Sequence, residues 1–180
     1  MIKPLRLLFL GLFGAAAVHI AIVFLLPAYS ERDAWSELAS KGGLYTTVRL
    51  GQGSAEGVLG EKDNPFFERA ACRFDLADGM ARVTSSETVP FWSFSIYDRE
   101  GFNVFNVSDR SASDGKLDAL IVTPAQLLEL RKGMPEALQT SLIAETELEE
   151  GMIVVRSFLP DESWRGIVDR FFARMRCEAY

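Results

Sequence analysis

Few side chains in this 180-residue chain have the types needed for nucleophilic or metal chemistry. His19 is the only histidine, and Cys72 and Cys177 are the only cysteines. Ser-His-Asp and Cys-His catalysis need an imidazole base, and His19 lies in a long apolar segment, so we expect neither mechanism. Two cysteines without further histidines also argue against a zinc site of the usual type. The sequence therefore predicts a protein that is not an enzyme and has no catalytic residues, metal or cofactor.

Acidic side chains are dense at Glu145, Glu147, Glu149 and Glu150. Paired carboxylates can act as acid and base when their environments separate their pKa values. A run of acids is more often a solvated face, and we adopt that interpretation. A carboxylate-dependent enzyme acting on an envelope polymer stays the weakest alternative.

A group of polar side chains follows an aromatic stretch and could line a ligand pocket or a contact surface for a partner. Asn and Asp at such positions also make turns, and that simpler interpretation stays open. The residues of this candidate surface are Tyr97, Asp98, Asn103, Asn106, Asp109 and Arg110.

The elements that must position these residues begin with a membrane anchor. Residues Leu7 to Leu26 carry no formal charge, and twenty helical residues span about 30 Å, the thickness of the hydrocarbon core. A cleaved signal peptide is the alternative, but its apolar region is usually shorter. Lys3 and Arg6 precede the segment, so the positive-inside rule predicts a cytoplasmic amino end and an exported body.

The predicted exported body, residues 30–180, has 17 basic and 25 acidic side chains. A domain this acidic is a poor partner for nucleic acid, which requires clustered Lys and Arg. Both cysteines lie in this body, where an oxidising compartment allows disulfides to persist. We expect a Cys72–Cys177 disulfide, with two unpaired buried thiols as the alternative.

Three residues of the span suggest a contact with another membrane helix. Gly11 and Ala15 form a small-xxx-small pair, which allows close helix approach. His19 lies near the middle of the span, where an unpaired polar group is costly. It could bond to a partner helix, or equally to its own backbone, water or lipid. The expected partners are the lipid bilayer and either a companion membrane protein or a second copy of this chain.

The sequence of the first half of the exported body predicts mainly strands. Residues 44–50 read as a strand, 51–60 as a mobile Gly-rich loop, and 30–40 as a short helix leaving the membrane. Residues 71–77 and 80–85 flank Asp78-Gly79, the favoured hairpin turn pair. Residues 90–97 and 102–107 alternate apolar and polar side chains and predict a second hairpin.

The second half predicts both helices and strands. A strand over 117–123 leads through Thr123-Pro124 into a helix over 125–132 that stops at Gly133. Residues 141–148 and 152–159 predict another hairpin, and a final helix over 161–177 places Trp164, Val168, Phe171 and Met175 on one face.

Together these elements predict an α+β fold. An N-terminal transmembrane helix precedes an antiparallel β-sheet domain with helices packed on one side, including a C-terminal amphipathic helix. The predicted parts are a cytoplasmic tip and anchor over 1–29, a juxtamembrane segment over 30–63, and a periplasmic domain over 64–180.

Three short sequence segments also resemble those of a known family. They are Ala71–Gly79 (ACRFDLADG), Phe91–Asp98 (FWSFSIYD) and Pro160–Arg165 (PDESWR). Read in order, they resemble the family called domain of unknown function 1254, in its short membrane-anchored bacterial form. The resemblance covers roughly Pro65 to Cys177. It implies a single-pass inner-membrane protein with a β-rich periplasmic domain, commonly encoded beside a companion, and it brings no established activity or catalytic residues.

These features predict a bitopic inner-membrane protein whose periplasmic domain is an interaction or assembly subunit of the cell envelope. A periplasmic small-molecule or glycan-binding module is the alternative. A pocket beside the aromatic hairpin would favour the binding module, and a flat apolar patch would favour the interaction subunit.

Overall fold

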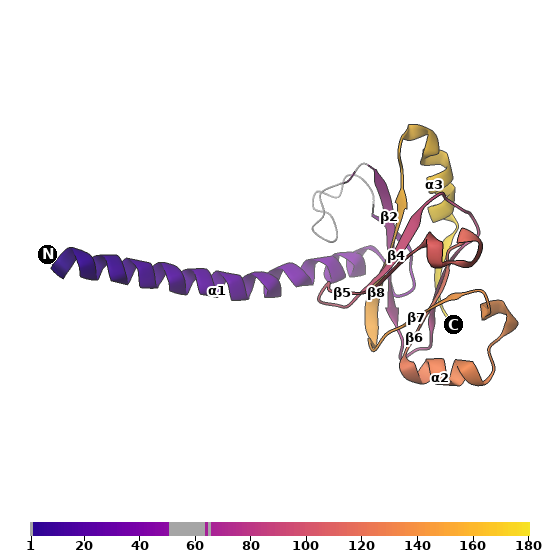
Figure 1. Ribbon diagram of the computed structural model, residues 1–180, viewed down its shortest axis with the longest axis horizontal. Helices are drawn as coiled ribbons and strands as arrows, with labels where there is room; N and C mark the ends of the chain where they lie inside the picture. Colours follow the sequence, from indigo (N-terminus) through magenta and orange to yellow (C-terminus); the bar gives the residue numbers. More distant parts are fainter. Residues whose placement is uncertain (1, 51–63, 65) are drawn as a thin grey trace.

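The computed structural model describes residues 2–50, 64 and 66–180, so the predicted Gly-rich loop over 51–60 lies outside the described residues. α1 (Ile2–Lys41) is a continuous helix that projects from a β-rich body (Figure 1). Its segment Arg6–Leu25 has a mean hydropathy of 2.5, and none of it is buried. The helix is therefore long and apolar enough to cross a membrane. Residues 30–40 continue α1 and do not form the separate helix that was predicted.

The first of two sheets has five strands, all antiparallel, in the order β1-β2-β8-β4-β5. The predicted hairpin of β4 and β5 is confirmed, with Phe94 opposite Val107. Only the end of the predicted 44–50 strand forms β1. The strands are β1 (Val48–Leu50), β2 (Phe67–Asp75), β4 (Trp92–Tyr97), β5 (Asn103–Ser108) and β8 (Glu150–Phe158).

The second sheet has four strands in the order β7-β6-β3-β9. β6 and β7 are parallel, whereas β3 pairs antiparallel with both β6 and β9. The strands are β3 (Ala81–Ser85), β6 (Asp118–Val122), β7 (Leu142–Glu145) and β9 (Met175–Ala179).

Two predicted hairpins are wrong. β2 and β3 flank Asp78-Gly79 but belong to different sheets, because β2 pairs along its whole length with β8. Gly79, at φ +138°, lies in the turn that carries the chain from one sheet to the other. The 141–148 and 152–159 segments do not pair either: β7 lies beside β6, and β8 lies between β2 and β4. The alternation of apolar and polar residues shows which face of a strand is buried, but it does not show which strand pairs with it.

The C-terminal helix is shorter than predicted. α3 (Arg165–Ala173) is followed by β9, which pairs with β3. Val168 and Phe171 are buried, as the predicted stripe requires, but Met175 belongs to the strand. Residues 175–178 alternate buried and exposed side chains, a period-2 pattern that the helical interpretation overlooked.

The main core lies between the two sheets, and the disulfide joins them. Cys72 of β2 and Cys177 of β9 are bonded, with their Cα atoms 6.6 Å apart. The core is formed by inward residues of both sheets and of α3, among them Phe74, Val83 and Phe171.

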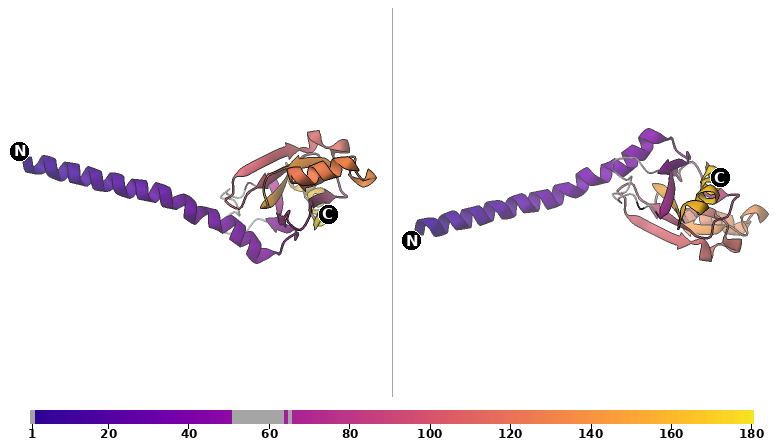
Figure 2. Two further views of the ribbon diagram at one scale, coloured as in Figure 1. Left: turned by 90° about the horizontal axis from the view of Figure 1, so that it is seen from below. Right: turned by 90° about the horizontal axis from the view of Figure 1, so that it is seen from above.

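The helices cover both outer faces and do not lie on one side as predicted. Leu38 of α1 packs on the five-stranded sheet, against Ala71 and Val154. α2 (Pro124–Lys132) packs on the four-stranded sheet through Leu127 and Leu130. The views from below and above show α1 and α2 at opposite sides of the body (Figure 2). The α+β class itself is confirmed.

α2 begins and ends where the sequence predicts. The Thr123 side chain accepts from the Gln126 backbone N–H at 3.2 Å, and the Gln126 side chain accepts from the Thr123 N–H at 2.9 Å. This reciprocal cap satisfies two amides at the first turn. Short 3-10 turns complete the fold: η1 (Asp109–Ser111), η2 (Ser113–Gly115), η3 (Glu136–Leu138) and η4 (Glu162–Trp164).

Candidate functional site

The six residues of the predicted polar surface are spread along the β4–β5 hairpin. Tyr97 and Asn103 are register partners at the turn end. Asp98 holds that turn, because its carboxylate accepts the Phe102 backbone N–H at 2.8 Å. This is the turn-forming role that the sequence left open for Asp98.

The other residues lie further along the strand. Asp109 and Arg110 belong to η1, beyond the far end of β5. Six strand residues span about 20 Å, so these two do not form one site with Tyr97 and Asp98. Asn106, halfway along β5, lines a groove that the sequence did not predict.

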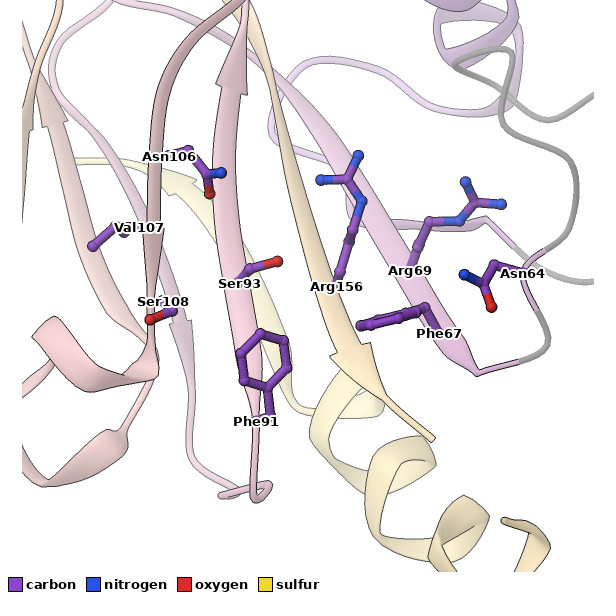
Figure 3. Close-up of a pocket in the computed structure, with 9 residues that line it drawn as sticks. All are labelled: Asn64, Phe67, Arg69, Phe91, Ser93, Asn106, Val107, Ser108 and Arg156. Carbon is purple, nitrogen blue, oxygen red and sulfur yellow. The ribbon is translucent and has the colours of Figure 1, made fainter. Parts of the chain in front are cut away.

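This groove lies on the outer face of the five-stranded sheet, the face turned away from the four-stranded sheet. We call it the outer groove. Its volume is about 630 Å³, within the roughly 300–1,000 Å³ of small-molecule sites. Figure 3 shows the side chains that line it: Asn64, Phe67, Arg69, Phe91, Ser93, Asn106, Val107, Ser108 and Arg156.

A row of polar residues crosses four strands through the outer groove. Paired residues of antiparallel strands point to the same face of a sheet. Arg69 of β2 is the register partner of Arg156 of β8, which also faces Ser93 of β4, and Ser93 faces Ser108 of β5. The two guanidinium groups therefore extend side by side (Figure 3).

The Arg156 side chain is held in position by two neighbours on β4. Its Nη2 donates to the Tyr97 hydroxyl at 2.9 Å and its Nη1 donates to Ser95 Oγ at 3.4 Å. Burial raises the pKa of Tyr97, but the hydrogen bonds from Arg156 and Asn103 outweigh it and the net pKa lies below 10.0. Tyr97 thus belongs to the groove by supporting Arg156.

An aromatic cluster borders the arginine pair. Phe67 is the register partner of Phe158. This pair is two residues along the strands from Arg69 and Arg156, so all four side chains point to the same face of the sheet. The Phe67 ring centroid lies 5.4 Å from that of Phe158 and 6.5 Å from that of Phe91. The outer groove therefore joins a cationic, hydrogen-bonding part to an apolar wall.

The polar lining residues of the outer groove are arginines, asparagines and serines. The described residues that line the outer groove include no carboxylate, histidine or cysteine, so this set offers no nucleophile with a partner base. Within the described residues, no group of three or more His, Cys, Asp or Glu side chains could hold a metal ion. Arginines and amides can instead bind an anionic or polar ligand.

The four clustered acids are exposed or half-buried, and they do not all lie in the same surroundings. Glu145 and Glu147 border a second pocket of about 500 Å³ with Val104 and Leu148. Glu150 lies apart, with its carboxylate 3.1 Å from Arg99 Nη1. The solvated-face interpretation fits this arrangement.

The three residues predicted for helix contact lie on α1. Gly11, Ala15 and His19 recur every four residues, so they share one face of the helix. A Cβ atom at Gly11 would have no neighbour within 4 Å. This face is accessible to lipid or to another helix.

Neither the arginine pair nor the aromatic wall was predicted from the sequence. One signal was present: Arg156 interrupts the apolar run MIVVRSF, and Arg69 stands in FERAAC. A charge within a strand that is otherwise buried marks a position that needs a partner. The register that brings the two together could not be read from either segment.

The body resembles solved structures in fold alone. The VPA0106 protein from Vibrio parahaemolyticus superimposes with a TM-score of 0.57 at 9% identity, over 84% of this chain and 35% of that one. A putative uncharacterized protein from Burkholderia cenocepacia gives 0.48 at 17% identity, over 79% and 38%. This chain thus spans little more than a third of either. No family model and no curated protein matches the chain.

Proposed function

We propose that the protein is a bitopic inner-membrane protein whose periplasmic domain binds a small ligand in the outer groove. The apolar, unburied Arg6–Leu25 segment supports the anchor. The Lys3 and Arg6 charges support a cytoplasmic amino end, and the Cys72–Cys177 disulfide supports an oxidising compartment for the body. The resemblance to domain of unknown function 1254 is part of this proposal.

The single observation that carries the binding function is the composition of the outer groove. Ligand sites combine apolar walls with a few well-placed polar groups. Phe67 and Phe91 supply the wall, and the held Arg156 supplies an oriented polar group. A ligand that matches both parts would be bound in one orientation.

Native mass spectrometry of the full-length protein, extracted in a mild neutral detergent, tests this function. We expect a bound small molecule on the wild type. Ser93→Trp fills the floor of the groove and should remove it, whereas Ser111→Trp, at an exposed position of η1, should not. Equal occupancy in both variants, or none in the wild type, would contradict a binding function for the groove.

Membrane orientation is tested separately. Protease added to intact spheroplasts should digest the body and leave a fragment that contains α1. A body that stays protected until the membrane is lysed would overturn the periplasmic assignment.

A second candidate function is an interaction subunit that contacts a companion membrane protein or another copy of this chain through α1. The observation that favours it is the accessible face of Gly11, Ala15 and His19. His19→Leu should reduce crosslinking of the full-length protein in native membranes, and Ile20→Leu, on a different face, should not. Unchanged crosslinking in His19→Leu would remove this candidate.

A further inference from the structure

β5 forms an open edge of the five-stranded sheet. It pairs with β4 on one side, and none of the described strands pairs with its other side. Both views in Figure 2 show β5, in pink, along the border of the body. The backbone N–H and C=O groups of such an edge can pair with a strand from another chain.

β5 lacks most of the features that protect sheet edges, which are short length, charged side chains, prolines and bulges. Within the two described sheets, β1 has only three residues, β7 ends in Glu145, and β9 carries Arg176 and Glu178. β5 has six residues with neither a charge nor a proline, NVFNVS. A shift in register beside Tyr97 marks its turn end, but residues 105–108 pair regularly with β4. Among these four edges, that of β5 is therefore best suited to accept a further strand.

A pocket of about 500 Å³ lies beside this edge, and we call it the edge pocket. Val104 lines it from β5, at the edge of one sheet, and Glu145 lines it from β7, at the edge of the other. Phe105 of β5 and Leu142 of β7 pack against the same core. The edge pocket therefore lies where the open sides of the two sheets meet. It is lined by Val104, Pro124, Glu145, Thr146, Glu147 and Leu148.

The side chains of the edge pocket indicate which residue it would accept. Val104 and Leu148 give it an apolar part. Glu145 and Glu147 are exposed, and neither forms an ion pair with another described residue. Both carboxylates therefore remain available to a cationic partner. A Lys or Arg side chain has an apolar stem and a cationic end, so it matches both parts of the pocket.

We propose that the β5 edge binds an extended segment of a partner protein as an additional strand, with a Lys or Arg side chain of that segment in the edge pocket. Added strands bind through backbone hydrogen bonds, and pockets for alternate side chains select the sequence. A second copy of this chain fits less well, because β5 contains no basic residue and two copies would bring acidic pockets together. The edge pocket shares no lining residue with the outer groove, so this inference goes beyond the proposed function and does not depend on it.

Fluorescence anisotropy of three labelled peptides with the full-length protein in a neutral detergent tests this inference. The peptide TVTKTVT has strand-forming residues and places its valines and its lysine on one face. TVTETVT exchanges the lysine for a glutamate, and TVPKPVT keeps the lysine but has prolines that prevent strand pairing. We expect TVTKTVT to bind at least about tenfold more tightly than either control. Equal binding of TVTETVT would overturn the choice of a basic side chain, equal binding of TVPKPVT would overturn strand addition, and no binding of TVTKTVT would overturn both.

Variants then assign peptide binding to the edge pocket. Glu145→Gln combined with Glu147→Gln should weaken TVTKTVT binding at least about fivefold, the effect of losing two exposed charge pairs. Glu136→Gln combined with Glu178→Gln removes the same charge from exposed positions elsewhere and should have no effect. Equal effects of the two double variants would show that only the net charge matters and would overturn the assignment to the pocket.

A substitution in β5 itself gives an independent check. Val104→Lys places a cation in the edge pocket and should weaken TVTKTVT binding at least about tenfold, whereas Leu128→Lys, at an exposed position of α2, should not. Unchanged binding in Val104→Lys would contradict the site; if this variant lowers the melting temperature, the exposed glutamate variants decide alone. If light scattering shows a wild-type dimer that excludes the peptide and that Val104→Lys dissociates, the occupant is a second copy and the proposal of a separate partner is wrong.

Discussion

The side chain of Arg156 lies between Arg69 and Tyr97 on the outer face of the five-stranded sheet. It lies opposite Arg69 across the β2–β8 pair and donates to Tyr97 on the other side. Tyr97 in turn contacts the cluster formed by the end of α1. A charged group held in this way loses less conformational entropy when it binds a ligand.

Replacement of Arg156 by Gln should raise the pKa of Tyr97. Burial raises that pKa, and the hydrogen bond from Arg156 is the largest of the effects that lower it below 10.0. Titration of tyrosinate absorbance, with Tyr97→Phe subtracted to isolate the Tyr97 signal, measures the change. An identical titration in wild type and Arg156→Gln would contradict the hydrogen bond.

The sign of the stability effect follows from the same shift. The pKa of Tyr97 is lower in the folded chain than in the unfolded one, so its ionisation stabilises the fold above the ordinary pKa of 10.0. That contribution disappears as the pH falls through the folded-state pKa. Arg156→Gln should therefore lose stability relative to wild type more strongly above pH 10 than at neutral pH.

At the scale of elements, α1 is both the candidate membrane span and part of the folded body. Leu38 is 1% exposed and packs on Ala71 and Val154. Two guanidinium groups lie near the Trp35 ring, with Arg73 Cζ and Arg99 Cζ each 5.1 Å from its centroid. Cations over an aromatic face add to the apolar contact. The body is therefore attached directly to the helix that leaves it.

A network of ion pairs also connects the helix α3 to the strand β2. The Glu68 carboxylate, whose side chain is 7% exposed, is 3.1 Å from Arg49 Nη2 and 3.2 Å from Arg165 Nη1. Arg49 also lies 4.9 Å from the Phe172 ring. This network joins β1, β2 and the start of α3 at the end of the sandwich.

Leu38→Ala should lower the free energy of unfolding by about 2–5 kcal/mol, the cost of truncating a buried leucine. Chemical denaturation of the detergent-solubilised full-length protein, followed by tryptophan fluorescence, measures this. Ser36→Ala, at an exposed position on the same helix, should stay close to wild type. Equal stability of Leu38→Ala and wild type would mean that α1 is not packed on the sheet in solution.

At the scale of the whole molecule, two sheets share one core and one covalent link. Cys72 and Cys177 are 105 residues apart and belong to different sheets. A crosslink over such a separation removes much of the conformational freedom of the unfolded chain. It also prevents β9, at the edge of the four-stranded sheet, from separating from β2.

Removal of the disulfide should cost about 4–5 kcal/mol of stability in the chain-entropy model. Denaturation of a Cys72→Ala, Cys177→Ala double variant, compared with wild type with and without reductant, tests this value. Reductant should destabilise the wild type and leave the double variant unchanged. Two thiols that react with a labelling reagent in unfolded, unreduced wild type would show that the bridge does not form.

Much of the local structure was predictable. Thr123-Pro124 and Gly133 mark the limits of α2, and the Asp98 turn marks the β4–β5 hairpin, because caps and tight turns depend on neighbouring residues. Asn106 lines the outer groove, but the groove itself was not predicted. Asp109 and Arg110 lie beyond the far end of β5 from Tyr97 and Asp98, and this separation depends on the length of the strand.

Sequence alone determined the long apolar helix, the alternating strands and the α+β class, because each follows from periodicity within one segment. The partners of those strands were decided by the tertiary structure. β2 pairs with β8 and not with β3, its neighbour in the sequence. β9 forms a strand because it pairs with the edge of β3. The outer groove depends on that choice: Arg69 and Arg156 meet only through the β2–β8 register, and hydrogen bonds between distant segments have no signature in either segment alone.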